Sequence, residues 1–506
     1  MDDDGSNVEK VGHINIGSAL HPTVLKDGRV MFTSYEAQGL RDQRNWALWA
    51  MWPDGRYWEP LMSAFSFAAA FHFQTQLGDG RIAVVEYYNL NNNGFGTLLA
   101  FDSVKNPAVP PFGKAQPGDS SNPGVRRGLW YFQPGHPSHL KPRYKSYPFS
   151  PPGLVNLTGF THGEDEASSR ALDGSFSGKV THPAAAPDND VMLVYSPGPA
   201  NSLNRPTSTP YYDGGIYILR GGVPANDHRD LVLIKNDPRY NEMMPRPVVP
   251  YSAIYGVAEP AKLPYLPNDG TASSALPAGS PFGLVGTSSF YKRDTTPGVY
   301  TPWNSSSWSN LDVFNTGEND ANSNWFEQGA DAGKYSNADI FAVRIVALEG
   351  VAHRSYGPGI GNNGIIGFSD HAGAERLRIL GEIPLRKPGG VIDPDGNPDT
   401  SFIARIPADT PFTFQTLDRD GLVLNMAQTW HQVRPGETRT DCGGCHAHSQ
   451  MGTDFRLTAA GRGASPIVDL IDRIEVLTKD PSGNTVTGGI PYFAPESFAR
   501  RLYVFS

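Results

Sequence analysis

Short apolar runs that follow polar turns recur along the first part of the chain. The turn at residues 26–29 precedes the apolar run 30–32, and the turn at 78–81 precedes the run 82–85. A turn rich in Asp, Asn or Gly that leads into a short apolar run is typical of a β-strand that enters a protein core. The pattern therefore predicts a protein built mainly from β-strands.

These turns belong to a loose internal repeat in which a histidine precedes each turn. His21, His72 and His182 hold this place, and a second apolar run follows each unit. The first two units start about 50 residues apart, a period that together with several strands per unit is typical of β-propeller blades. We therefore expect a β-propeller, with the three histidines capping turns.

The pattern of apolar and polar residues changes after about residue 376. Four apolar runs predict short strands, at residues 379–384, 401–406, 412–417 and 422–426. Farther on, the spacing of Ile467, Leu470, Ile471 and Ile474 predicts a short amphipathic helix over 466–477.

The composition fits a protein of strands and loops. The 506 residues include 55 glycines and 44 prolines, and 18% are charged, with a net charge of −9. Gly and Pro are used well above their average, and no large cluster of basic residues stands out, which argues against nucleic acid as a partner. No apolar run reaches the roughly 18 residues that a membrane-spanning helix needs, so we expect no transmembrane segment.

The chain carries one motif with specific chemistry, within residues 441–450. Cys442, Cys445 and His446 form Cys-x-x-Cys-His, the attachment signature of a c-type haem, and the chain has only these two cysteines. Two thiols three positions apart can each bond to one vinyl group of a haem, and the next imidazole can bind the iron as the proximal ligand. Gly443 and Gly444 suit a turn that a flat macrocycle approaches closely. The sequence therefore predicts one covalently bound haem c.

Two other interpretations of the motif stay open. The cysteines can form a redox disulfide, or Cys442, Cys445, His446 and His448 can form a cramped zinc site. Since the chain has no second cysteine pair, a four-thiolate zinc site is excluded.

The distal side of the iron has several candidate neighbours. We predict His431 as a ligand or pocket residue and Trp430 as a residue that packs on the ring, and Met426 and Met451 are also near in sequence. A Met or His at the sixth position makes an electron carrier, whereas an open position leaves a binding or catalytic iron.

The haem motif also bears on location. The first residues are acidic and lack the basic and apolar regions of a secretory signal. Because haem is attached covalently outside the cytoplasmic membrane, we expect a periplasmic or otherwise extracytoplasmic protein whose signal peptide has been removed.

The residues that lead to the motif resemble a known family. Runs at 406–409, 414–418, 429–430 and 434–437, followed by 442–446, are similar to the region before a haem in hydrazine synthase alpha-subunit-like proteins, which are propeller-bearing c-type cytochromes. The resemblance implies a propeller against which the haem segment packs, an extracytoplasmic location, and a haem that reacts with small nitrogen compounds. The family's tyrosine ligand soon after the motif has no counterpart, since the first tyrosine after His446 is Tyr492. Its zinc-binding cysteine is also absent.

These observations predict four parts along the chain. They are a disordered lead-in (1–12), a β-propeller (13–375) with long inserted loops (103–180 and 259–338), a small β-sandwich-like domain (376–437), and a haem-attachment segment with the C-terminal tail (438–506). The first functional hypothesis is a haem protein that binds or transforms a small molecule, such as a haem-dependent oxidoreductase. The alternatives are an electron-transfer relay subunit with a six-coordinate haem, which implies a redox partner or other subunits, and a propeller binding module with a structural haem. Whether the chain is an enzyme stays open at this stage.

Overall fold

The computed structural model describes the chain in segments separated by gaps. These segments are residues 4–13, 19–35, 46–62, 69–88, 94–103, 155–161, 178–197, 213–291, 337–349, 376–426, 430–443 and 452–470.

Three four-stranded sheets form from consecutive strands. The first sheet contains β1 (Ala19–Val24), β2 (Val30–Tyr35), β3 (Trp46–Met51) and β4 (Glu59–Met62). The second contains β5 (Ala69–Gln76), β6 (Ile82–Tyr88), β7 (Thr97–Phe101) and β8 (Val155–Asn156), and the third β9 (Lys179–Ala185), β10 (Val191–Ser196), β11 (Gly215–Leu219) and β12 (Val232–Lys235). In each sheet, neighbouring strands are antiparallel and follow one another along the chain.

Two further sheets form from strands far apart in sequence. The fourth sheet has the order β19 (Thr438–Arg439), β13 (Phe282–Thr287), β16 (Phe402–Pro407) and β20 (Val468–Asp469). The fifth has the order β15 (Arg376–Pro384), β14 (Ala342–Glu349), β17 (Phe412–Leu417) and β18 (Val423–Met426). The described helices are short: α1 (Tyr251–Tyr255) and the 3-10 turns Pro187–Asn189, Arg220–Gly222, His228–Asp230, Asn337–Asp339 and Phe455–Leu457.

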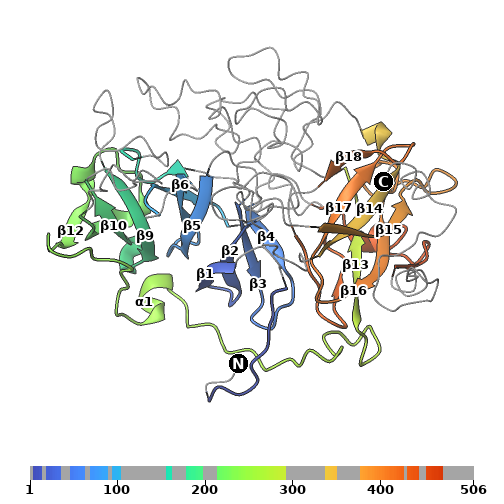
Figure 1. Ribbon diagram of the computed structural model, residues 1–506, viewed down its shortest axis with the longest axis horizontal. Helices are drawn as coiled ribbons and strands as arrows, with labels where there is room; N and C mark the ends of the chain where they lie inside the picture. The colour runs from blue at the N-terminus through green and yellow to red at the C-terminus, as the bar shows by residue number, and fades with distance from the viewer. Residues whose placement is uncertain are drawn as a thin grey trace, which may run out of the picture.

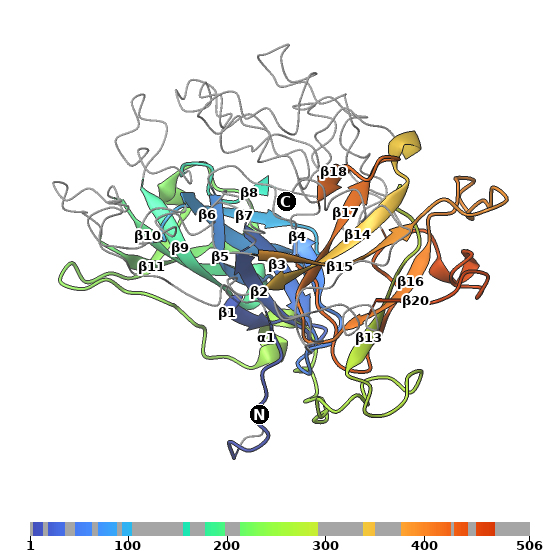
Figure 2. The same ribbon diagram turned by 45° about the vertical axis from the view of Figure 1, so that its right-hand side comes forward.

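The sheets lie next to one another in a definite order. Across Figure 1 the third, second and first sheets are followed by the two C-terminal sheets, with the first sheet in the middle. Among the first strands of these sheets, β5 contacts both β1 and β9. Figure 2 shows the fourth and fifth sheets beside each other, and residues of both share one apolar core, including Val285, Val343, Ile345 and Ala404.

The mainly β fold class is confirmed. The four strands expected between residues 379 and 426 are present as β15 to β18. However, β16 pairs with β13, and β15 and β17 pair with β14, two strands that we had grouped with the propeller. The helix expected over 466–477 is wrong at its start, because residues 468–469 form β20 and pair with β16; its end lies outside the described residues. In the part of the chain that the structure describes, the sheets do not close into a ring.

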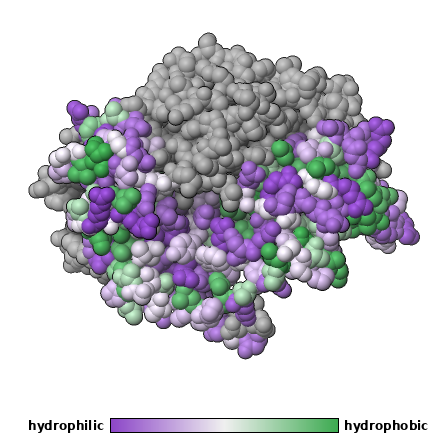
Figure 3. All heavy atoms as spheres, turned by 180° about the vertical axis from the view of Figure 1, so that it is seen from behind, coloured by the Kyte–Doolittle hydropathy of each residue, from purple (hydrophilic) through white to green (hydrophobic). Residues whose placement is uncertain are grey.

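A long linker connects the third sheet to the fourth. Residues 236–281 pass along the lower side of Figure 1 through α1. On the way, Tyr255 donates a hydrogen bond to the Gln76 carbonyl of the second sheet (3.1 Å), and Arg56 of the first sheet donates to Ala272 (3.4 Å). The linker also leaves Tyr240 and Val248 exposed, and Figure 3 shows hydrophobic residues scattered among hydrophilic ones over the described surface of one face.

The three repeat histidines do not cap turns, so that expectation is wrong. They lie within the first strands of the first three sheets, where β1, β5 and β9 are irregular. His21, Phe73 and His182 have positive φ values of 54°, 54° and 47°, and the Phe73 ring lies 4.3 Å from the His21 ring and 4.0 Å from the His182 ring. We call His21, His72, Phe73 and His182 the histidine junction.

Burial keeps the histidines of this junction neutral. Loss of solvent lowers the pKa of His72 to about 3 and that of His182 to about 4, and the nearby His21 adds to both shifts. His21 also has a lowered pKa, because it too is partly buried. His72 forms a hydrogen bond through Nδ1 with the Tyr87 hydroxyl. The junction therefore packs the three sheets together only while these rings carry no charge.

This predicts a loss of stability at mildly acidic pH. Below a pH of about 6.5 the unfolded chain takes up a proton on His182 that the folded chain does not, so the free energy of unfolding falls as pH falls, until about pH 4. The cost is about 1.4 kcal/mol per pH unit for this one histidine. Asn tolerates positive φ, so His182→Asn removes the titration without adding backbone strain.

Urea unfolding at pH 7, 6 and 5 measures this effect. We expect the stability of the wild type to fall more steeply with acid than that of His182→Asn. Equal slopes for the two proteins would contradict a neutral, buried His182.

Candidate functional site

The described part of the cysteine motif is its beginning. Asp441, Cys442 and Gly443 are described, whereas Cys445 and His446 lie outside the described residues. Gly444, His448 and Met451 also lie outside them, as does the side chain of Met426. The site is therefore built from the segment that leads into the motif and from its neighbours.

The edge of the fourth sheet positions Cys442. β19 runs parallel to β13, with Thr438 opposite Leu284 and Arg439 opposite Val285, and the Cys442 amide then donates to the Gly286 carbonyl (3.3 Å). The Cys442 side chain is half-buried against the shared core of the fourth and fifth sheets. Half-buried aromatic residues pack on the same core, namely Phe290, Tyr291 and Phe414. The first thiol of the motif thus lies at the border of an apolar region.

A buried arginine holds the residue before this cysteine. Arg439 is 3% exposed and donates to both carboxylate oxygens of Asp441 (2.7 and 3.1 Å) and to the Trp58 carbonyl (3.0 Å). Its guanidinium also lies over the Tyr57 ring, 5.2 Å from the centroid. Because these contacts use several of the guanidinium donors, Arg439 ties the approach to the motif to the first sheet.

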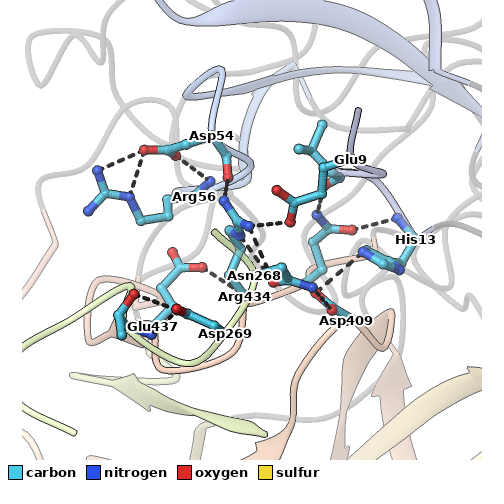
Figure 4. A network of polar contacts seen from close by, with 12 residues as sticks. Glu9, His13, Asp54, Arg56, Asn268, Asp269, Asp409, Arg434 and Glu437 are labelled. Carbon is cyan, nitrogen blue, oxygen red and sulfur yellow. Dashed lines mark hydrogen bonds and ion pairs between the residues drawn. The ribbon is translucent and has the colours of Figure 1, made fainter. Parts of the chain in front are cut away.

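Five residues before Arg439, a second arginine joins more distant segments (Figure 4). Arg434 donates to the Glu9 carboxylate, to the Asp54 carbonyl and to the Asn268 side chain, the last at 3.3 Å. Glu437 accepts from the amides of Arg434 (2.8 Å) and Tyr57 (2.9 Å). We call Glu9, Asp54, Asn268, Arg434 and Glu437 the Arg434 network.

The Arg434 network extends to the start of the chain and to the turn between β16 and β17. Asn268 donates to Asp409 (2.6 Å), and His13 lies 3.3 Å from the other oxygen of Asp409. Gln432 accepts from the His13 amide (2.9 Å) and donates to the Val11 carbonyl (2.6 Å). Residues 9–13, which include the end of the expected disordered lead-in (1–12), are thus bound to the segment that carries the motif.

The Glu437 carboxyl lies in the protein interior. The residue is 2% exposed, and burial raises the pKa of its carboxyl, while Arg439 and the two amides act in the opposite direction. A buried carboxyl is stable only when its oxygens have donors, and both oxygens of Glu437 have one.

Trp430 and His431, which we predicted near the haem, lie in the interior. Trp430 is 1% exposed, and its carbonyl accepts from the Trp58 indole (2.9 Å). His431 is 6% exposed, and its ring lies 5.2 Å from that of Trp49 and 5.7 Å from that of Phe412. His431 thus packs β3 of the first sheet against β17, and Trp430 bonds to the residue before β4. The contact of both residues with a haem stays a prediction.

Sequence reasoning found part of this site. Arg434 and Glu437 stand in a run that carried the family resemblance, but their role was not predicted. His13, Asn268 and Asp409 were missed, because no local pattern connects residues so far apart in the chain. In the described segments, no group of three or more His, Cys, Asp or Glu residues is arranged to hold a metal ion.

The cysteine motif falls within a match to a known domain. Residues 338–447 match the family model described as hydrazine synthase alpha subunit middle domain. Among solved structures, Kuenenia stuttgartiensis hydrazine synthase is similar, with a TM-score of 0.46 and 17% sequence identity. That match covers 94% of this chain and 50% of the other chain, so this chain spans about half of its length. No curated protein matches the chain, and no described helix is long and apolar enough to cross a membrane.

The Arg434 network makes a prediction about stability. Replacing Arg434 with Met leaves the Glu9 carboxylate and the carbonyl of Asp54 without this donor in a largely buried place. Breaking such a buried pair costs about 3–5 kcal/mol of unfolding free energy. Urea unfolding of the variant and of the wild type measures this loss of unfolding free energy.

Arg229→Met is the matched control. Arg229 pairs with Asp227 (2.6 Å), but its side chain is 79% exposed, so we expect little change in stability. If Arg434→Met proves as stable as Arg229→Met, the network does not hold these segments together.

Proposed function

Given that the chain belongs to a hydrazine synthase alpha-like family, we propose that it is an extracytoplasmic haem protein of that family. One haem c is bound by thioether bonds to Cys442 and Cys445, with His446 as the proximal ligand. The observation that carries the proposal is the match over residues 338–447, which includes the whole Cys-x-x-Cys-His motif.

The described residues fit a haem at this place. A porphyrin is a broad apolar disc, and the first thiol lies half-buried beside an apolar core on which half-buried aromatic rings also pack. The residues on the approach have their polar groups bound to protein partners, as Arg439 and Glu437 show. This arrangement supplies an apolar neighbour for the macrocycle and a fixed starting point for the attachment loop.

When bound, the haem supplies an iron that can hold a small ligand or exchange an electron. The chain's own residues do the rest. Arg439 and the Arg434 network orient the segment that carries Cys442, and the shared core beside Cys442 excludes water from one side. We propose a small, nitrogen-containing molecule as the ligand, in keeping with the family.

The N-terminal sheets support the propeller that we propose as the scaffold. Each of the first three sheets is a meander of four consecutive strands, as in a propeller blade. Their first strands lie next to one another, since β5 contacts both β1 and β9. Because the matched family model describes one subunit, we also propose other subunits or a redox partner as binding partners.

Haem attachment is tested by making the full chain with an export signal and the c-type maturation machinery. We expect a coloured protein with one haem per chain in the pyridine haemochrome assay, and a colourless Cys442→Ser/Cys445→Ser variant. The single variant Arg229→Met serves as the control, since its side chain is 79% exposed and the attachment motif stays intact. A colourless wild type would contradict the proposal.

The absorption spectrum of the same sample distinguishes a haem that binds a small molecule from a haem that only transfers electrons. A high-spin ferric haem that binds CO or NO rapidly supports reaction with a small molecule at the iron. A low-spin haem that ignores both ligands contradicts this and supports the electron-transfer alternative.

A further inference from the structure

The chain leaves the described region at Gly443 and returns at Gly452 to nearly the same place. A Cβ placed on Gly452 would lie 2.8 Å from the carbonyl oxygen of Gly443. The residues between them include Cys445 and His446. The haem motif therefore stands in a loop whose two ends are in contact.

Close packing requires glycine at both ends. A Cβ on Gly443 would lie 2.8 Å from the backbone nitrogen of Ser288, closer still to the Ser288 hydroxyl, and 3.0 Å from the Thr287 hydroxyl. Neither Gly443 nor Gly452 has a positive φ, so the backbone conformation does not demand glycine. Glycine is needed at 443 because the chain beyond β13 is so close, and at 452 because the Gly443 carbonyl is so close.

Both ends of the loop are tied to the fourth sheet. Before the loop, Cys442 is bonded to Gly286. After it, Thr453 donates to the Asp395 carboxylate, and the Ala459 amide donates to Asp399 (2.7 Å). The Phe455 ring also lies next to Gly286, where a Cβ would come within 3.1 Å of it. These contacts hold the loop ends without any help from a bound group.

A closed base matters for the chemistry of attachment. Two thioether bonds form only if both sulfur atoms reach the two vinyl groups of one porphyrin. Cys442 is fixed at the base of the loop, so the position of the base decides where Cys445 and His446 start from. Fixing the ends in advance also reduces the conformations that the loop must give up when the bonds form.

We propose that Gly443, packed against Ser288, and Gly452, packed against Gly443, are positioning residues for haem attachment. They form the closed base of the attachment loop and do not touch the reacting atoms. This inference rests on the proposed function, because it has no meaning for a chain that binds no haem.

The test compares Gly443→Ala and Gly452→Ala with Gly12→Ala. Gly12 is the matched control, because a Cβ there would meet only Trp58 ring atoms at an ordinary 3.7 Å. We expect the haem content per chain to fall several-fold in both loop variants and to stay unchanged in Gly12→Ala. Mass spectrometry and the position of the haemochrome band should show a larger share of haem held by one thioether bond. A purely structural role would not change that share.

Two further measurements separate the outcomes. Urea unfolding of each variant in the haem-free Cys442→Ser/Cys445→Ser background shows whether the fold survives, and we expect it to do so. Adding Ser288→Gly to Gly443→Ala removes the hydroxyl contact and should restore part of the attachment.

The results have distinct meanings. A wild type without haem contradicts the proposed function and leaves the loop base without a role in attachment. A wild type with full haem and loop variants with equally full, doubly bonded haem overturns the inference alone. Unfolding of both loop variants also overturns it, because the base would then serve the fold and not the attachment.

Discussion

The arrangement of the site depends on burying Arg434 with each of its three guanidinium nitrogens donating to an acceptor. Taking a guanidinium and a carboxylate out of water is costly unless each atom finds a partner. Here the partners come from the start of the chain, the first sheet and the linker, with Glu9, Asp54 and Asn268 around one arginine. Segments that are far apart in sequence must therefore come together for any of them to be stable there. The motif-bearing segment is held in place by this constraint together with the pairing of its short strand β19 with β13.

The same constraint explains how the site relates to the row of sheets. The first sheet sends the turn between β3 and β4 toward the motif segment, where Tyr57 and Trp58 meet Glu437 and Arg439. The fourth sheet receives that segment as β19. A haem at Cys442 would therefore stand where the first sheet and the two C-terminal sheets meet.

The sequence predicted what is local. Apolar runs after Asp-Gly turns became β2 and β6, because a strand needs only its own side chains to be recognised. The haem motif was also found, since its chemistry lies within five consecutive positions. Pairing of β13 with β16 was not predicted, because it joins segments more than a hundred residues apart. The short helix expected after residue 466 was wrong because an open edge of β16 offered backbone hydrogen bonds to β20.

The histidine junction shows the same limit in another form. The repeat placed His21 and His182 at equivalent positions, but the irregular pairing in β1 and β9 that turns their rings toward Phe73 has no simple pattern in sequence. Burial then lowers the pKa of these imidazoles, so they stay uncharged at a pH where an exposed imidazole takes up a proton.

The central claim is that both sulfur atoms of the chain are bonded to one porphyrin. Tandem mass spectrometry of the proteolytic peptide that contains residues 442–446 tests it most directly. The account predicts a peptide that carries the mass of one haem and withstands reduction. A peptide without haem that gains two hydrogens on reduction, as expected for a Cys442–Cys445 disulfide, contradicts it.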